Sequence, residues 1–407
     1  MLFVYPLLAD GLLLRHLERP LLYNIFTEDM WELDEEAFVA LQYFTGTWSI
    51  EEIAKEMNID KSEILDLVDA LGTDLILDKR ISGDSKRLIV NKSQIPSLRT
   101  LLIHTTLVCN LVCRHCYLDK SEKDFITPNI FKSAVAQLDQ MQGYKVLISG
   151  GEPLLHPKIF EMLQSIKELK LRKMLLTNGM LIDNETVAKL KPLIQEVQIS
   201  IDGTKSHNSF RNNSTAFKKA MDAVKLLVAE ELDVSVATMV HSQNLKELPE
   251  LESILKEIGI KAWALDVPSQ AGEFAKYPEL YPSIEEAGKA LRTYGWGAPF
   301  EETSNVYACG SHLCALMPNG DISKCGFFTD KPVGNLSQKS LSECWKLIQK
   351  DFIWEQKELE CAKLECPFLE DCKGGCRFRA SINSGQLLGV DRVKCAAFGF
   401  EYQKKER

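Results

Sequence analysis

Residues 106–117 read Thr-Leu-Val-Cys-Asn-Leu-Val-Cys-Arg-His-Cys-Tyr, with cysteines at Cys109, Cys113 and Cys116. The spacing Cys-x3-Cys-x2-Cys lets three thiolates on one loop bind a single cubane iron–sulfur cluster. The fourth iron of that cluster then has no protein ligand, so it can bind a small molecule. The stretch predicts an iron–sulfur centre with an open coordination position.

The residues around the last cysteine make the motif more specific, because His115 precedes it and Tyr117 follows it. The motif resembles the signature of the radical S-adenosylmethionine (SAM) superfamily. The resemblance implies that the three cysteines hold a [4Fe-4S] cluster, which binds SAM and cleaves it reductively to a 5'-deoxyadenosyl radical. A zinc site is the alternative, with His104 and His115 as the nearby imidazoles.

Composition limits the class of protein. The chain has 407 residues, 45% of them hydrophobic, which is enough for two or three domains with filled cores. No apolar stretch approaches the length of a membrane span, and Met1–Ala9 lacks the features of a signal peptide, so we expect a cytoplasmic protein without a membrane partner. Twelve cysteines in a reducing compartment indicate metal ligation. The net charge of -9 gives no reason to expect nucleic acid as a partner.

The middle of the chain alternates between strand-like and helix-like segments. Apolar, β-rich runs occur at 101–107, 144–149, 172–177, 195–201, 233–240 and 261–267. Helical patterns lie between and after them, at 128–142, 156–169, 184–192, 214–230, 244–258 and 283–294. Six such βα units predict an α/β fold with a parallel sheet. They match the partial (β/α)6 barrel of the radical SAM superfamily, over residues 101–295, with its site at the carboxyl ends of the strands.

Polar motifs follow most of these strands. The second strand is followed by Ser149-Gly150-Gly151-Glu152-Pro153, which resembles the Gly-Gly-Glu-Pro motif of the superfamily. In that family the glycines let the backbone approach the SAM amine, and the glutamate helps to hold it. By this resemblance we expect the following residues to contact SAM: Tyr117, Gly150, Gly151, Glu152, Asn178, Ser200, Asp202 and Arg211. For Asp202 and Arg211 the alternative is that either one simply forms an ion pair on the surface.

Eight further cysteines lie in the last hundred residues. They resemble the SPASM extension of radical SAM peptide maturases, which implies two auxiliary [4Fe-4S] clusters in residues 296–407. By that resemblance one cluster is held by Cys309, Cys314, Cys325 and Cys376, and the other by Cys361, Cys366, Cys372 and Cys395. The chain departs from the family where Cys361-x4-Cys366 replaces the usual Cys-x2-Cys. A zinc ribbon built on Cys366 and its neighbours is the alternative, and Cys344 is predicted to be an ordinary core residue.

The first 81 residues contain no cysteine and are predicted to form a domain of their own. Strand patterns at 12–17, 21–26 and 30–33 precede helices at 34–44, 50–57 and 61–76. This order resembles the winged-helix-like, PqqD-like domain that binds the leader of a precursor peptide as an added strand. DNA binding is the alternative, but the third helix has a mainly acidic exposed face, which repels phosphate. Residues 82–100 are expected to be a linker.

The resemblances together imply a radical SAM/SPASM enzyme that abstracts a hydrogen from a ribosomally made precursor peptide and modifies it oxidatively, for example by a thioether or another cross-link. They also imply an external electron donor of the flavodoxin or ferredoxin type. No catalytic base is predicted. The alternatives are an enzyme acting on tetrapyrrole side chains, a sulfatase-type maturase, and an iron–sulfur regulator or electron carrier without catalysis. Gly326 follows Cys325, where sulfatase maturases have an acidic residue.

Overall fold

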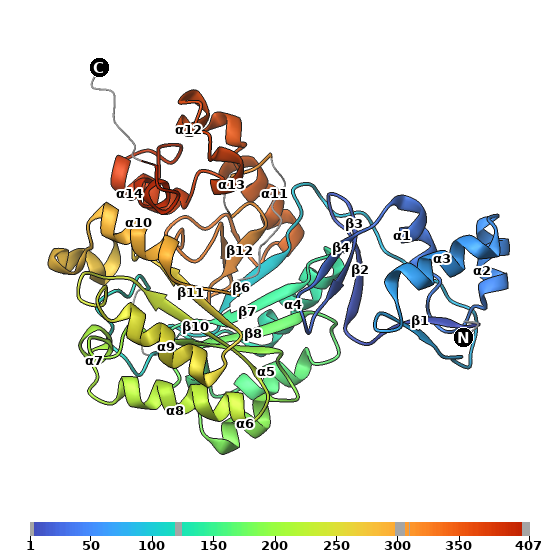
Figure 1. The fold of residues 1–407 in the computed structure, drawn as a ribbon, viewed down its shortest axis with the longest axis horizontal. Helices are drawn as coiled ribbons and strands as arrows, with labels where there is room; N and C mark the ends of the chain where they lie inside the picture. The colour runs from blue at the N-terminus through green and yellow to red at the C-terminus, as the bar shows by residue number, and fades with distance from the viewer. Residues whose placement is uncertain (1–3, 119–123, 298–305, 309, 401–407) are drawn as a thin grey trace. The chain divides into compact units, whose positions relative to one another are not determined.

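A computed structural model describes residues 4–118, 124–297, 306–308 and 310–400. The chain divides into two compact units (Figure 1). Unit 1 comprises Met1–Arg99, Asp139–Tyr144 and Lys170–Arg172, and unit 2 comprises Thr100–Leu138, Lys145–Leu169 and Lys173–Arg407. Within the described ranges, no helix is both long and apolar enough to cross a membrane.

Unit 1 contains two small antiparallel sheets and three helices. One sheet pairs β1 (Pro6–Leu8) with β5 (Ile76–Asp78), and the other has the order β2 (Leu12–His16), β3 (Pro20–Asn24), β4 (Met30–Glu32). The helices are α1 (Glu35–Leu41), α2 (Ile50–Met57) and α3 (Lys61–Leu71). The three strands and three helices occur in the predicted order. The prediction that the last helix extends to residue 76 is wrong, because Gly72 has a positive φ of 79° and Ile76 begins β5.

Local sequence explains where the helices of unit 1 begin. Ser49 and Glu52 form a capping box at the start of α2, and Asp60 and Glu63 form another at α3. Ile64 and Val68 of α3 are buried in the same core as Leu22 of β3. The segment 82–99 also packs within unit 1, since Ser97 and Arg99 both bind the Glu18 carboxylate, the latter at 2.7 Å. The expected linker is therefore held to the N-terminal unit.

Unit 2 is built on a nine-stranded sheet with the order β11-β10-β9-β8-β7-β6-β12-β13-β14. Its first six strands in sequence are β6 (Thr100–His104), β7 (Lys145–Ser149), β8 (Arg172–Thr177), β9 (Glu196–Ser200), β10 (Asp233–Met239) and β11 (Ala262–Asp266). The registers between β6 and β7 and from β8 through β11 are parallel. The prediction of a parallel sheet in a partial barrel is confirmed.

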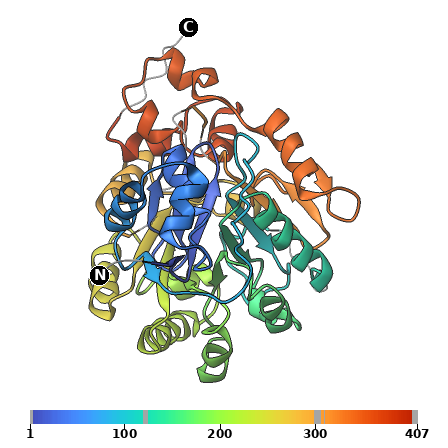
Figure 2. The same cartoon turned by 90° about the vertical axis from the view of Figure 1, so that its right-hand side faces the viewer.

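Helices connect these strands and pack along the outside of the sheet (Figures 1 and 2). Those up to the last barrel strand are α4 (Pro128–Gln140), α5 (Ile159–Ser165), α6 (Asn184–Leu190), α7 (His207–Arg211), α8 (Ala216–Ala229) and α9 (Leu248–Ile258), with the 3-10 turn η1 (Pro153–Leu155). Thr127 caps the start of α4, since its Oγ1 accepts a hydrogen bond from the Ile130 amide. The strands point their apolar side chains into this core, where Val146, Leu175 and Val236 are fully buried.

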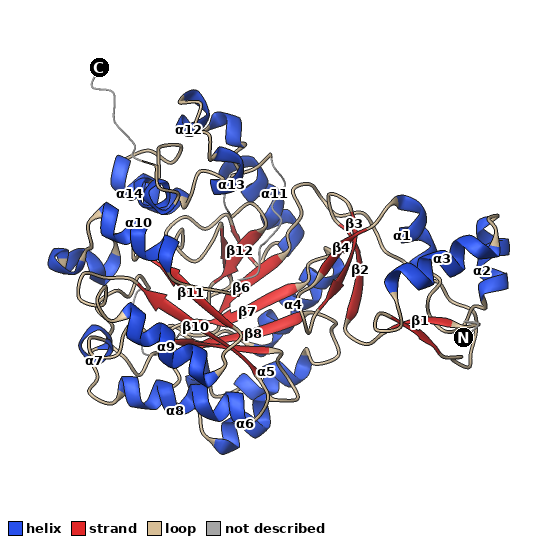
Figure 3. Ribbon diagram, in the orientation of Figure 1, coloured by secondary structure: helices blue, strands red, loops and turns tan. Residues whose placement is uncertain are grey.

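The C-terminal part of unit 2 is mostly helix and loop (Figure 3). Its strands are β12 (Leu313–Leu316), β13 (Asp321–Ser323) and β14 (Gly334–Asn335), and its helices are α10 (Ile284–Thr293), α11 (Leu341–Phe352), α12 (Glu360–Lys363), α13 (Leu369–Cys372), α14 (Arg377–Ser384) and α15 (Arg392–Ala397). Short 3-10 turns occur at η2 (Gly272–Lys276), η3 (Pro278–Leu280) and η4 (Gln356–Glu358). β12 pairs in parallel with β6, so the cysteine-rich region continues the barrel sheet and lies in the same compact unit.

Candidate functional site

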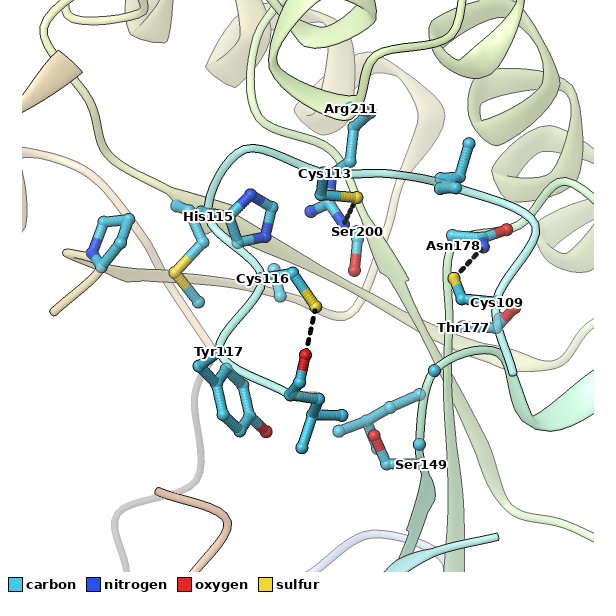
Figure 4. A pocket seen from close by; sticks show the side chains of 18 of the residues that line it. Cys109, Cys113, His115, Cys116, Tyr117, Ser149, Thr177, Asn178, Ser200 and Arg211 are labelled. Atoms are coloured by element: carbon cyan, nitrogen blue, oxygen red, sulfur yellow. Dashed lines mark hydrogen bonds between the residues drawn. The ribbon is translucent and has the colours of Figure 1, made fainter. Parts of the chain in front are cut away.

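A cavity of about 250 Å³ opens where the barrel strands end (Figure 4). Its wall includes the residue at or near the carboxyl end of each of five successive strands: Ser149 of β7, Thr177 of β8, Ser200 of β9, Met239 of β10 and Asp266 of β11. The loop after β6 supplies the remaining side, with all three cysteines of the 106–117 stretch. Parallel strands place their carboxyl ends at one edge, which is why residues so distant in sequence share one cavity.

The three thiols each meet a different polar group. Cys109 Sγ lies 4.0 Å from the Asn178 side-chain amide, and Cys116 Sγ lies 3.7 Å from the Leu118 carbonyl oxygen. Cys113 Sγ lies 3.8 Å from an Arg211 guanidinium nitrogen. Burial raises the pKa of Cys109 to about 11 and also raises the pKa of Cys113. These thiols therefore stay protonated at neutral pH unless a bound cation stabilises the thiolates.

The donor set and its surroundings fit an iron–sulfur cluster with a small ligand beside it. Three thiols line one cavity, which has about 250 Å³ of free volume beside them. Within the described ranges, no three His, Cys, Asp or Glu side chains converge closely enough to share a single metal ion. A [4Fe-4S] cluster does not need the thiolates to converge on one metal ion, because each thiolate binds a separate iron.

The two glycines after β7 have a structural task that the sequence did not reveal. A Cβ atom on Gly150 would lie 2.3 Å from the Thr106 carbonyl oxygen, and one on Gly151 would lie 2.4 Å from the Val108 carbonyl oxygen. Both of these clashes would be with backbone atoms, which cannot move aside as a flexible side chain can. The glycines thus let the β7 turn pack directly against the start of the cysteine loop, and both also line the cavity.

Glu152 lies behind the cavity wall. Its side chain is fully buried, and its carboxylate accepts hydrogen bonds from Thr177 Oγ1 at 2.7 Å, the Asn178 amide at 2.9 Å and the Leu154 amide at 3.1 Å. Burial raises the pKa of Glu152, against the lowering effect of these donors. These hydrogen bonds join the ends of β7 and β8, and Glu152 does not line the cavity. Its contact with SAM stays a prediction.

Four other predicted residues do lie on the cavity: Tyr117, Asn178, Ser200 and Arg211. The Asn178 side chain donates a hydrogen bond to Asn110 Oδ1 at 2.7 Å, which fixes its orientation beside Cys109. Tyr117 contacts the ring of Phe327, with ring centroids 4.7 Å apart. Phe327 also lines the cavity, and it was missed from sequence although it stands only two residues after Cys325.

Asp202 and Arg211 pair with each other in the interior, so the alternative that either forms an ion pair on the surface is wrong. The Arg211 Nε to Asp202 Oδ2 distance is 2.6 Å, and the two side chains are 9% and 0% exposed. Burial alone would raise the pKa of Asp202, yet the neighbouring Arg211 guanidinium holds it well below its usual range. Asp202 does not reach the cavity, whereas Arg211 does.

Asp266, the last residue of β11, connects the cavity wall to a distant part of the chain. Its Oδ1 atom accepts a hydrogen bond from the Val267 amide and lies 2.7 Å from a guanidinium nitrogen of Arg379 in α14. The same guanidinium forms three bonds to the fully buried carboxylate of Asp391, whose Oδ2 also accepts the Cys376 amide. This network of hydrogen bonds joins the cavity wall to the cysteine-rich region. No local sequence pattern predicts it, because its members lie far apart in the sequence.

The cysteine-rich region contains a second, smaller cavity of about 10 Å³. Four cysteines line it together with apolar side chains such as Phe368, Phe398 and Phe400: Cys361, Cys366, Cys372 and Cys395. These are the four that the sequence analysis grouped together. Of the other group, Cys314 is buried in β12, and Cys325 and Cys376 are close enough for each to influence the other's charge. Cys309 lies outside the described residues.

Comparison with known proteins assigns the central part of the chain. The family description "Radical SAM superfamily" matches residues 103–255, which include the cysteine loop and the strands around the cavity. The chain contains a radical SAM domain.

Two curated relatives extend this similarity. The chain is 27% identical over 304 residues to the antilisterial bacteriocin subtilosin biosynthesis protein AlbA of Bacillus subtilis, covering 68% of this chain and 66% of AlbA. It is 25% identical over 337 residues to the AdoMet-dependent heme synthase of Methanosarcina barkeri, covering 71% of this chain and 94% of that enzyme. Both similarities cover more than two thirds of this chain, but the two names denote different reactions.

Among solved structures, the fold is similar to that of Streptococcus suis SuiB bound to its precursor peptide SuiA. The TM-score is 0.73 at 18% identity, and the match covers 96% of this chain and 99% of SuiB. Because the match covers nearly the whole chain, the arrangement of elements outside the radical SAM domain also has a known counterpart.

Proposed function

We propose that this chain is a radical SAM enzyme that oxidatively modifies a ribosomally made precursor peptide. The observation that carries the proposal is the combination, in one chain, of a cysteine-lined cavity at the barrel strand ends and a separate N-terminal unit whose sheet ends at the edge strand β4. When bound, a [4Fe-4S] cluster and SAM supply a 5'-deoxyadenosyl radical, which abstracts an unactivated hydrogen. The similarity to AlbA and SuiB supports a peptide as the substrate.

The cavity residues have separate tasks in this proposal. Cys109, Cys113 and Cys116 hold the cluster. Gly150, Gly151, Asn178, Ser200 and Tyr117 line the space beside it and bind SAM, while Glu152 fixes the strand ends that carry these groups. The walls exclude water from the radical, which is the protein's main contribution besides orientation.

The two auxiliary clusters remain part of the proposal. The small apolar cavity that Cys361, Cys366, Cys372 and Cys395 line suits a cluster closed by four thiolates, which relays electrons and binds no substrate. Cys309, Cys314, Cys325 and Cys376 are proposed to hold the other one. In the cytoplasm, a flavodoxin or ferredoxin would supply the electrons.

The precursor peptide is proposed to bind the domain of residues 1–81. β4 is an edge strand of its sheet, so its outer side is available for an added peptide strand. Trp31 of β4 and Leu67 and Leu71 of α3 are only partly buried against the core and offer apolar contacts. Asp66 and Asp69 on α3 are exposed and acidic, which favours a peptide with basic residues over DNA.

The test uses the full chain and synthetic peptides translated from short reading frames next to the gene. Peptide binding is measured by fluorescence anisotropy, and the product by mass spectrometry, where each cross-link removes two hydrogens. The double variant Asp66→Arg, Asp69→Arg should weaken binding about tenfold or more, since two charges reverse, while dithionite-driven SAM cleavage stays at the wild-type rate. Asp222→Arg, on an exposed position of α8, is the matched control.

A tetrapyrrole substrate is the second candidate, because one relative is a heme synthase that the chain covers almost entirely. Turnover of an iron porphyrin carboxylate at an equal rate in wild type and in the α3 double variant would favour it. Failure of all peptides to bind, together with such turnover, would overturn the peptide proposal.

A further inference from the structure

The short helix α7 is attached to the cysteine loop by three contacts. The Phe210 ring stacks on the His115 ring with centroids 4.5 Å apart and an interplanar angle of 11°. The Phe210 carbonyl oxygen accepts the Arg114 amide at 2.9 Å. The next residue, Arg211, points a guanidinium nitrogen at Cys113 Sγ (Figure 4). Residues 210 and 211 are therefore in direct contact with residues 113–115 of the cysteine loop.

Other groups keep this arrangement rigid. His241 stacks on the opposite face of Phe210, with centroids 4.0 Å apart. Asp202, which binds Arg211 Nε, is itself held because its Oδ1 accepts the Met239 amide at 2.9 Å. The guanidinium thus has one nitrogen committed to a buried carboxylate and another directed at the sulfur.

We propose that Arg211 is a positioning residue for the cluster: its guanidinium donates to the Cys113 sulfur and stabilises the thiolate, and Asp202 orients it. This goes beyond the expected role of Arg211 as a SAM ligand. The consequence is electrostatic, because hydrogen bonds and charge near the cluster sulfurs set the reduction potential of an iron–sulfur centre. The role requires only that the three cysteines hold a cluster, so it does not depend on the identity of the substrate.

The two members of the pair make opposite predictions. Arg211→Gln removes a cation and a donor from Cys113 and leaves Asp202 buried without its counter-charge, so the midpoint potential of the cluster should shift to lower values. Asp202→Asn removes an anion of nearly the same shape, so the potential should shift to higher values. A purely structural role for the pair would not give shifts of opposite sign.

The experiment is a redox titration of the anaerobically reconstituted full chain, followed by electron paramagnetic resonance in the absence of SAM. The Cys109→Ala, Cys113→Ala, Cys116→Ala triple variant identifies the signals of any other cluster, which are subtracted. Arg292→Gln, on α10, controls for the loss of an arginine charge away from the loop. Iron content and circular dichroism establish that each variant is loaded and folded, and Arg211→Met, which also removes the cation and the donor, replaces Arg211→Gln if the latter does not load.

SAM affinity, measured by equilibrium dialysis of the same samples, separates the two roles of Arg211. Opposite shifts of the SAM-free midpoint potential support the proposal, whatever happens to SAM affinity. Unchanged SAM-free potentials and spectra in both variants, with weaker SAM binding in Arg211→Gln, would overturn it and make Arg211 a SAM ligand.

Discussion

The two cysteine-lined cavities of this protein differ in volume, in the number of their cysteines and in the residues that surround them. The cavity at the strand ends has a volume of about 250 Å³, and its wall includes polar residues from the ends of four strands, Ser149, Thr177, Ser200 and Asp266. The cavity among Cys361, Cys366, Cys372 and Cys395 has about 10 Å³ and a wall rich in phenylalanine. Three thiols with space beside them suit a centre that binds a substrate, whereas four thiols without space suit one that only transfers electrons. The number of cysteines and the free volume thus separate the two roles.

Removing each set of cysteines should give the largest contrast. The Cys109→Ala, Cys113→Ala, Cys116→Ala variant should lose about four irons per chain and all SAM cleavage, since its open cluster is gone. A variant with alanine at Cys361, Cys366, Cys372 and Cys395 should also lose about four irons but still cleave SAM with dithionite. Iron and sulfide analysis with chromatography of 5'-deoxyadenosine measures both. Zinc in place of iron, or equal activity losses in the two variants, would contradict this division.

The next largest effect should come from Arg379, which connects the two regions. Arg379→Met leaves Asp391 buried without a counter-charge, because the Asp391 side chain is 0% exposed. Breaking a buried pair in this way costs about 3–5 kcal/mol of unfolding free energy. Denaturant unfolding at pH 7 measures this loss of stability. The control is Arg292→Met, because the Arg292 guanidinium donates to the Ala396 carbonyl oxygen at 3.0 Å and forms no ion pair within the described ranges. The control should lower the unfolding free energy by less than about 1 kcal/mol. Equal stabilities of the two variants would mean that the Asp266–Arg379–Asp391 network does not stabilise the fold.

How much of this could be read from the sequence differs between the two cavities. The strand-end cavity was predictable, because the six βα units and the turn motifs after the strands fix which residues meet there. The burial of the Asp202–Arg211 pair was not, since nine residues of spacing allow a pair on the surface or inside. The contact of Asp266 with Arg379 joins positions 113 apart in sequence, and no periodicity encodes such a contact.

A pH dependence of the unfolding free energy should arise from His104, the last residue of the barrel strand β6. His104 is fully buried, neither ring nitrogen has a hydrogen-bond partner in the described part of the chain, and burial lowers its pKa to about 4. Because the folded pKa lies below the unfolded value of about 6.5, the stability is present above pH 6.5 and is lost as the pH falls toward 4. Between pH 7 and pH 5 this group should cost about 2 kcal/mol.

The measurement is the free energy of unfolding at the two pH values in wild type and in His104→Leu. The variant should lose most of that pH-dependent difference, whatever its absolute stability. An identical pH dependence in both proteins would show that His104 is not the source.

The smallest effect should come from Cys344, which lines neither cavity and belongs to neither predicted group of auxiliary-cluster cysteines. Cys344 is a fully buried residue of α11 and packs as a small apolar side chain. Cys344→Ala should leave the iron content and SAM cleavage unchanged and lower the unfolding free energy by about 1 kcal/mol. Loss of iron in this variant would require a different assignment of the ligands and would weaken the contrast between the two cavities.

The parallel pairing of β6 with β12 also has a consequence for how the chain is made. β6 ends at His104 and β12 begins at Leu313, so about 210 residues separate the two partners in sequence. At roughly 5–20 residues per second, a ribosome needs about 10–40 s to synthesise that stretch. During this time β6 has β7 on one side and an unpaired edge on the other. The strand that leads into the cysteine loop thus gains its second neighbour only after residues 313–316 have been synthesised.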